Sequence, residues 1–405
     1  MNTNNDEREF IKASNEVIDE FFKGNIRVFH DKSEFKKFWY KSKNEIDEHH
    51  FCMFPDCNQK AIKRSHTIQA EGPLNCVAEN RHVLQPVFRD GFIILEKQGL
   101  EKKASVFPGY CKQHEKVFEF EKNKKLTSKK DYKLQIFRTI CKEIYIVKRN
   151  LSLDRNRLNS YIKMQNKIFS EKILEKMHLK ALNTEEFKVS KVETEEIQWI
   201  QRSLNSEEKH LELLESFYKN SINDLESKDS ENLEYLVFRN EEIQLPVCLA
   251  GVAIAGGRRV GEKKYRNVPL ILNVLPYDGG TDLVIATFKD NKDMVDAYTQ
   301  QYFQNMNTHL EFLSIVETWM INGVDFWFLK PSIWENKDLK KQKNIIKKMN
   351  QLKYGIFTPY NGSIFDDLRK QIIIQVKMNL ANGEYKGIEK IVKGYLKKEE
   401  KKLYR

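Results

Sequence analysis

The sequence predicts an α+β protein of three segments, because the residue pattern changes character twice along the chain. Residues 1–130 hold short apolar runs broken by proline and glycine, and they contain most of the cysteine and histidine. Residues 131–230 carry a helical apolar repeat, and residues 231–405 open with β-rich runs. We therefore expect an N-terminal module held by side-chain ligands, a long helical hairpin, and a C-terminal α+β domain with a small antiparallel sheet.

The composition indicates a soluble protein with a positive field. The 405 residues carry a net charge of +11, and such a field attracts polyanions, although many basic proteins bind no nucleic acid. Six cysteines are too few for a disulfide scaffold, and the first residues lack the pattern of a signal peptide. The longest apolar run, residues 245–255, is too short to span a bilayer. These observations predict a cytoplasmic protein without a membrane segment.

The middle and C-terminal segments are predicted from periodicity. Apolar residues recur every three or four positions from Tyr132 to Val147, which is typical of an amphipathic helix. Residues 150–230 contain no proline or glycine and predict the helical hairpin, broken near Asn183. The runs LEYLVFR, LPVCLAGVAIA, VPLILNVLP and DLVIATF follow, separated by turn residues, and predict the strands of the sheet.

The cysteines and histidines of the first segment are spaced as metal ligands. Cys52 and Cys57 form a C-x4-C pair around a proline, which turns the backbone so that two thiolates converge. Cys111 and His114 supply a second pair, C-x2-H, after an interval of 53 residues. Three cysteines and one histidine make a usual tetrahedral set for structural Zn²⁺ and leave no open coordination position. We therefore expect a structural zinc ion that closes the intervening loop.

Two alternatives to this ligand set stay open. In the first, His66, His82 or Cys76 replaces one of the four ligands. In the second, the cysteines are free and act as small buried apolar residues.

Two histidines within the loop are candidate acid–base groups. His66 and His82 are not needed to complete the metal site, and an imidazole can take a proton from water or a ribose 2′-hydroxyl and return one to a leaving oxygen. Arg81 precedes His82 and could offset charge that develops on a phosphate. The competing interpretation is that both rings only pack, with their nitrogens bonded to backbone carbonyls.

Basic residues near these histidines are candidate contacts for a nucleic-acid backbone. They lie on both sides of the loop and comprise Lys63, Arg64, Lys112 and Lys116. Charged runs are usually solvated faces, so their position beside the predicted site is what favours a role in phosphate binding.

The first segment resembles the HNH, or ββα-metal, nucleases. In that family a cysteine knuckle precedes a strand that ends in a histidine base. Here three residues separate Cys57 from AIKRSHTI, which puts His66 at the matching place. Two features depart from the pattern: FPGYCKQH stands in place of a second cysteine knuckle, and no His-x3-His follows the strand pair to hold a catalytic metal.

A resemblance over nearly the whole chain is carried by further motifs, namely SHTIQ, RHVLQP, FPGYCKQHEKVF, IFRTICKEIY and VPLILNVLPYDGGTDLVI. The chain resembles a family of bacterial anti-phage zinc-finger proteins, the ring-activated zinc-finger ribonucleases. The resemblance implies RNA cleavage, self-assembly of identical chains into a ring, and activation by a phage structural protein that the C-terminal part recognises.

Three functions follow as hypotheses. The first is an endoribonuclease, favoured because an internal 2′-hydroxyl lets two histidines and a cation suffice, whereas DNA hydrolysis generally uses a catalytic metal. The second is an HNH-type, metal-dependent DNA endonuclease. The third is a zinc finger that binds nucleic acid without cutting it.

Overall fold

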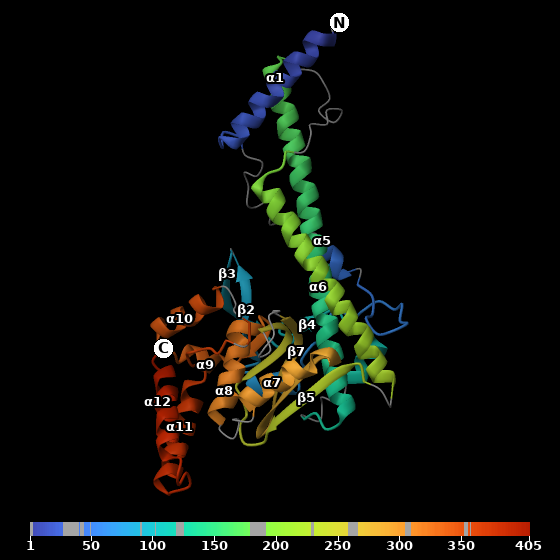
Figure 1. Cartoon of the computed structure of the whole chain (residues 1–405). Helices are drawn as coiled ribbons and strands as arrows, with labels where there is room; N and C mark the ends of the chain where they lie inside the picture. The colour runs from blue at the N-terminus through green and yellow to red at the C-terminus, as the bar shows by residue number, and fades with distance from the viewer. Residues whose placement is uncertain are drawn as a thin grey trace. The chain divides into compact units, whose positions relative to one another are not determined.

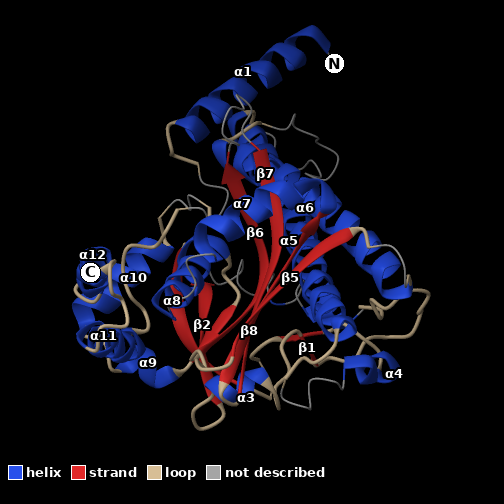
Figure 2. Cartoon of the chain, turned by 60° about the horizontal axis from the view of Figure 1, so that its bottom comes forward, coloured by secondary structure: helices blue, strands red, loops and turns tan. Residues whose placement is uncertain are grey.

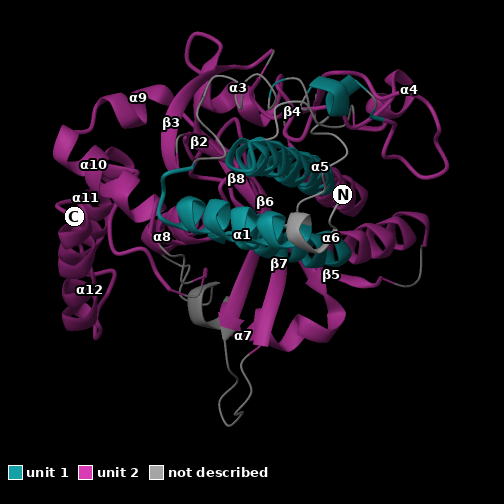
Figure 3. Ribbon diagram, turned by 90° about the horizontal axis from the view of Figure 1, so that it is seen from above, with its two compact units in different colours: residues 1–50, 144–213 teal, residues 51–143, 214–405 magenta. Residues whose placement is uncertain are grey.

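The computed structural model describes residues 3–26, 40, 44–48, 50–89, 91–101, 103–118, 125–178, 192–227, 231–257, 266–303, 309–351, 355–356 and 358–405. The chain is mixed α+β and divides into two compact units, residues 1–50 with 144–213 and residues 51–143 with 214–405 (Figure 3). Two long helices, α5 (Lys129–Lys176) and α6 (Glu195–Glu226), contribute to both units. The division into domains 1–130, 131–230 and 231–405 stays a prediction.

The two long helices are those of the predicted hairpin (Figure 1). α5 begins before the expected Tyr132 and continues to Lys176 without interruption, because no proline or glycine breaks it. The expected break near Asn183 lies outside the described residues. Despite the length of α5, no helix in the described ranges is both long and apolar enough to cross a membrane.

The first unit is built on helix packing. α1 (Thr3–Phe22) buries Ala13 and Val17 against Phe169 and Ile173 of α5. The ring of Phe21 meets the Phe169 ring edge-on, with centroids 5.4 Å apart. This contact gives the apolar stripe of α1 a partner, which a helix of this length needs for stability in water.

The second unit contains a seven-stranded antiparallel sheet in the order β3-β2-β9-β6-β7-β8-β5 (Figure 2). Four strands come from the predicted β-rich runs, whereas β2 and β3 form a hairpin within the first 130 residues and join the sheet through β9. The strands are β2 (His82–Arg89), β3 (Phe92–Gly99), β5 (Leu233–Asn240), β6 (Val247–Gly257), β7 (Arg266–Tyr277), β8 (Gly280–Phe288) and β9 (Trp327–Leu329). The sheet therefore extends beyond the C-terminal segment that the sequence predicted for it.

The central strands are buried on both faces, which explains their nearly continuous apolar sequence. On one face, Leu270 and Leu272 of β7 pack into a core with the C-terminal helices. On the other face, the Gln135 amide nitrogen of α5 lies 3.0 Å from Asn273 Oδ1, and Cys248 Sγ lies 3.1 Å from the carbonyl oxygen of Pro73. Pro73 begins a short helix, α3 (Pro73–Val77), so the second face is covered by the N-terminal part of the unit.

The C-terminal helices and their short connecting turns surround a buried ion network. Arg369 is fully buried and donates to the carboxylates of Glu317 and Glu399 and, over 3.1 Å, to Ser363 Oγ. Glu317 also accepts from the backbone N–H of Ile364 over 2.7 Å, so the charges are paired and hydrogen-bonded. The helical segments of this part are η2 (Lys289–Asn291), α7 (Lys292–Phe303), α8 (His309–Thr318), η3 (Trp319–Gly323), α9 (Pro331–Glu335), α10 (Leu339–Met349), α11 (Asp366–Ala381) and α12 (Glu389–Lys402).

We predict that Arg369→Met destabilises the chain by roughly 3–5 kcal/mol, because it leaves two buried carboxylates without their partner. The measurement is urea denaturation followed by circular dichroism. Lys377→Ala is the control, since it removes an ion pair of 2.6 Å to Glu400 whose Lys377 side chain is 53% exposed. Equal midpoints for the two variants would show that the network does not hold these helices together.

Candidate metal centre

Backbone hydrogen bonds bring the two cysteine-bearing segments together. The loop that begins at Cys52 closes on itself through the Cys52 N–H, which donates to the Gln59 carbonyl oxygen over 2.8 Å. The Met53 N–H donates to the Gly109 carbonyl oxygen over 2.8 Å, and the Ile62 N–H donates to the Tyr110 carbonyl oxygen over 2.7 Å. These hydrogen bonds join the segment of the first cysteine pair to the residues that immediately precede the second pair. We call the described residues from 51 to 118 the Cys/His module.

The four predicted ligands, Cys52, Cys57, Cys111 and His114, converge. Their ligand atoms all lie within 4.8 Å of one another. Cys57 Sγ is 3.9 Å from Cys111 Sγ, and His114 Nδ1 is 3.4 Å from Cys52 Sγ and 3.5 Å from Cys111 Sγ. A tetrahedral ion with metal–sulfur bonds of about 2.3 Å would separate its sulfur ligands by about 3.8 Å, so this spacing fits a structural metal ion. His66, His82 and Cys76 are not part of the cluster.

Backbone N–H groups favour the thiolate form of one of the four ligands, Cys111. Cys111 is the N-cap residue of a short helix, α4 (Lys112–Glu115). Burial by itself would raise the pKa of Cys111, but the backbone N–H groups of His114 and Gln113 donate to its sulfur and lower that pKa overall. Burial raises the pKa of Cys52 to about 11, against the opposing effect of backbone hydrogen bonds. A metal ion would hold both sulfurs as thiolates, and Cys111 is the one that ionises more readily.

The imidazole of His114 is held in place by an aromatic neighbour. The Phe54 ring stacks on it with centroids 4.4 Å apart and an angle of 17° between planes. Phe54 lies between the two cysteines of the first pair, so this residue helps to orient a ligand of the second. The stacking gives the C-x4-C loop a packing role that the cysteine spacing did not reveal.

His66 lies on a two-residue strand between anchored neighbours. β1 (Ser65–His66) pairs antiparallel with β4 (Val106–Phe107), and His66 stands opposite Val106. Ser65 Oγ accepts from the Tyr110 N–H over 3.0 Å. The carbonyl oxygen of Thr67 accepts from the Gln135 amide over 3.2 Å, in the same buried group that reaches Asn273. The backbone of His66 is therefore fixed both to the segment before Cys111 and to the sheet.

The environment of the His66 ring identifies its neutral tautomer. Nε2 lies 3.3 Å from the Leu100 carbonyl oxygen, and a carbonyl oxygen can only accept, so Nε2 carries the proton and Nδ1 carries the lone pair. Burial lowers the pKa of His66, and the charges of Arg138 and Arg64 add to this effect. A neutral imidazole with a free Nδ1 lone pair is the form that a general base requires.

Arg81 and His82 belong to a tight hairpin turn. The backbone N–H of Glu79 donates to the His82 carbonyl oxygen, and the N–H of His82 donates to that of Glu79, each over 2.9 Å. The two residues between them, Asn80 and Arg81, have φ of 49° and 59°, as a turn of two left-handed residues requires. A left-handed arginine is uncommon, and such strain is often found at functional positions.

The three candidate catalytic residues surround one segment, residues 99–101. His82 pairs with Gly99 in the β2–β3 register, and the Arg81 carbonyl oxygen accepts from the Leu100 N–H over 3.0 Å. The Arg81 side chain is exposed and lies 2.6 Å from Glu101, so a phosphate would have to compete with that carboxylate. An exposed pair of this kind contributes at most about 1 kcal/mol, so the competition is not prohibitive.

The four candidate backbone contacts, Lys63, Arg64, Lys112 and Lys116, are all exposed. Lys63 and Arg64 precede β1, while Lys112 begins α4 and Lys116 follows it. They therefore stand on the two segments whose cysteines and histidine converge. None of the four forms an ion pair with a residue in the described ranges, so their charges are available to an anion.

The sequence interpretation missed a buried ion pair beside His66. Arg138 of α5 is fully buried, donates to Glu115 Oε1 over 2.7 Å, and lies 4.6 Å from the centre of the Phe118 ring. The charges of Arg138 and Glu115 act on the His66 pKa in opposite directions. The available signal was an arginine inside the apolar face of a helix, next to Phe137, where a charge needs a partner.

No known protein family matches the chain, and neither a curated protein nor a solved structure shows significant similarity to it. The resemblance to HNH nucleases and to ring-activated zinc-finger ribonucleases consequently stays a hypothesis.

We predict that Cys57→Ser and Cys111→Ala each abolish stoichiometric metal binding, because three ligands cannot hold a structural ion as four do. Inductively coupled plasma mass spectrometry of the purified chain measures the metal content. Cys76→Ser is the matched control, since Cys76 is half-buried and lies outside the cluster. Full metal content in Cys57→Ser would contradict the assignment of the ligands.

Proposed function

We propose that the chain is an endoribonuclease in which a structural zinc ion holds the Cys/His module and His66 is the general base. The observation that carries this proposal is the fixed tautomer of His66, whose Nε2 faces the Leu100 carbonyl oxygen at 3.3 Å. Its Nδ1 then accepts the proton of a ribose 2′-hydroxyl, and the resulting oxygen attacks the adjacent phosphorus. The bond from phosphorus to the 5′-oxygen breaks and leaves a 2′,3′-cyclic phosphate.

The leaving 5′-oxygen needs a proton, and in this proposal the protonated imidazole of His82 supplies it. Its Nδ1 lies 2.7 Å from the Asn80 carbonyl oxygen, which leaves Nε2 as the nitrogen that exchanges a proton with the substrate. Arg81 would stabilise the charge that develops on the phosphate once it leaves Glu101. Lys63, Arg64, Lys112 and Lys116 would contact neighbouring phosphates of the RNA.

Zinc is the ion that suits the donor set. Three thiolates and one imidazole are soft and borderline ligands, which favour Zn²⁺ over Mg²⁺ or Ca²⁺. Protein side chains then fill all four coordination positions, so the ion has a structural role in this proposal. The acid–base chemistry is carried out by His66 and His82.

The biological setting that we propose rests on the resemblance alone. It comprises bacterial defence against phage, assembly of identical chains into a ring, and activation when a phage structural protein contacts residues 231–405. A cytoplasmic location accords with this setting and with the reduced cysteines that metal binding requires.

We predict that His66→Gln abolishes cleavage of a single-stranded RNA and retains metal content and thermal stability. The glutamine amide can still donate to the Leu100 carbonyl oxygen but has no basic nitrogen. His309→Ala is the control, because His309 lies on α8 beside Glu242, at 2.8 Å, and away from the Cys/His module. Gel analysis should show products with cyclic-phosphate ends without added Mg²⁺ for the wild-type chain and the control.

The pH profile adds an independent readout. Since burial lowers the pKa of His66, the base stays neutral as the pH falls through the usual range of histidine. Cleavage should therefore decline only at a more acidic pH than an exposed histidine would give. Undiminished cleavage by His66→Gln would remove His66 from the mechanism.

The same assay separates the competing functions. An HNH-type DNA endonuclease requires added Mg²⁺ or Mn²⁺ and leaves 5′-phosphate ends on DNA. Salt-sensitive binding of RNA without any product after long incubation would identify a non-catalytic zinc finger.

A further inference from the structure

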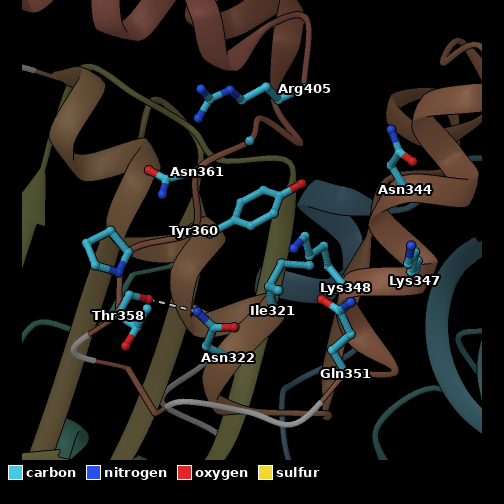
Figure 4. A pocket seen from close by; sticks show the side chains of 12 residues that line it. Ile321, Asn322, Asn344, Lys347, Lys348, Gln351, Thr358, Tyr360, Asn361 and Arg405 are labelled. Atoms are coloured by element: carbon cyan, nitrogen blue, oxygen red, sulfur yellow. Dashed lines mark hydrogen bonds between the residues drawn. The ribbon is translucent and has the colours of Figure 1, made fainter.

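A cavity of about 520 Å³ opens among the C-terminal helices, apart from the residues of the Cys/His module. It is formed by η3, by the second half of α10, by residues 358–362 and by Arg405 (Figure 4). Its size falls within the range of about 300–1,000 Å³ that is usual for small-molecule sites.

The lining of the cavity contains lysines and an arginine but no acid. No aspartate or glutamate lines it, and the sequence from Leu339 to Phe365 contains six lysines and no acidic residue. Neither Lys347 nor Lys348 forms an ion pair with any residue that the structure describes. Lys341 of the same helix is different, because it is buried and lies 2.6 Å from an oxygen of Asp366. Two lysines at this cavity are therefore available to an anionic ligand.

The remainder of the lining is suited to a flat polar group. Asn322 donates to the Thr358 carbonyl oxygen over 2.8 Å, which fixes the orientation of its amide. Asn344, Gln351 and Asn361 add further amides, each of which offers both donors and an acceptor. Figure 4 shows the Tyr360 ring at the centre of the lining, with Lys348 extending from α10 toward it. An aromatic ring surrounded by amides can stack on a base and bond to its edge.

The backbone around the cavity has two unusual features, a π-helical turn and a glycine packed against a tyrosine ring. Trp319–Gly323 forms a π-helical turn, a rare geometry that occurs frequently at functional sites. The Tyr360 ring lies against Gly362, where an added Cβ would stand 2.4 Å from the tyrosine hydroxyl. Tyr360 is buried, and the glycine is what gives its ring room beside the cavity.

We infer that this cavity binds a mononucleotide, with Lys347 and Lys348 on the phosphates and the amides and Tyr360 at the base. A phosphate group alone would fill only part of the cavity and would leave the amides unused. The site shares no residue with the proposed ribonuclease centre, so the two proposals stand or fall separately.

The test is equilibrium dialysis of the full chain with labelled ATP, GTP and AMP in turn. The double variant Lys347→Ala/Lys348→Ala should bind the preferred nucleotide at least about tenfold more weakly, because it loses charge-assisted hydrogen bonds to phosphate. The control is Lys340→Ala/Lys343→Ala, which removes the same charge from exposed positions of α10 that do not line the cavity. The control should change the affinity by less than about twofold, since exposed charges act weakly through salt solution.

Three results would overturn the inference. The first is absence of binding by all three nucleotides at millimolar concentration. The second is an equal loss of nucleotide affinity in the two double variants, which would indicate that the nucleotide binds to a diffuse basic surface. The third is complete displacement of the nucleotide by an equal concentration of inorganic phosphate, or binding of single-stranded RNA alone, because either would assign the lysines to a ligand without base recognition.

Discussion

The convergence of Cys52 and Cys57 with Cys111 and His114 is the constraint on which the candidate active site depends. The two pairs are separated by 53 residues, yet their ligand atoms come within 4.8 Å of one another. Hydrogen bonds across the two segments support this meeting, but the strands that they form, β1 and β4, have only two residues each. A metal ion held by the four ligands would stabilise this meeting of the two segments further.

The same constraint explains how His66 is held. Its strand pairs with the segment that leads into Cys111, and the next residue, Thr67, is bonded to Gln135 of α5. Gln135 in turn reaches Asn273 in the middle of the sheet. The backbone of His66 is therefore fixed between the ligand cluster on one side and the hydrophobic core on the other, as the proposed role of this residue requires.

The sequence predicted those features that depend on residue type and spacing. Two close ligand pairs identified the four converging residues, and the β-rich runs predicted four strands of the sheet correctly. It did not predict that β2 and β3 extend this sheet, because pairing through β9 joins residues about 245 positions apart, such as Leu84 and Leu329, and leaves no local pattern. The cavity at Tyr360 was missed for the same reason, since it is assembled from several segments. The Arg138–Glu115 pair was missed although the arginine within the apolar face of a helix was a local signal.

X-ray absorption at the zinc edge of the purified full chain tests the central claim most directly. The account predicts a first shell of three sulfur atoms at about 2.3 Å and one nitrogen atom at about 2.0 Å. Cys111→Ala should lose that shell, whereas Cys76→Ser should keep it. A shell made of oxygen and nitrogen, or a wild-type chain that folds fully without any metal, would contradict the account.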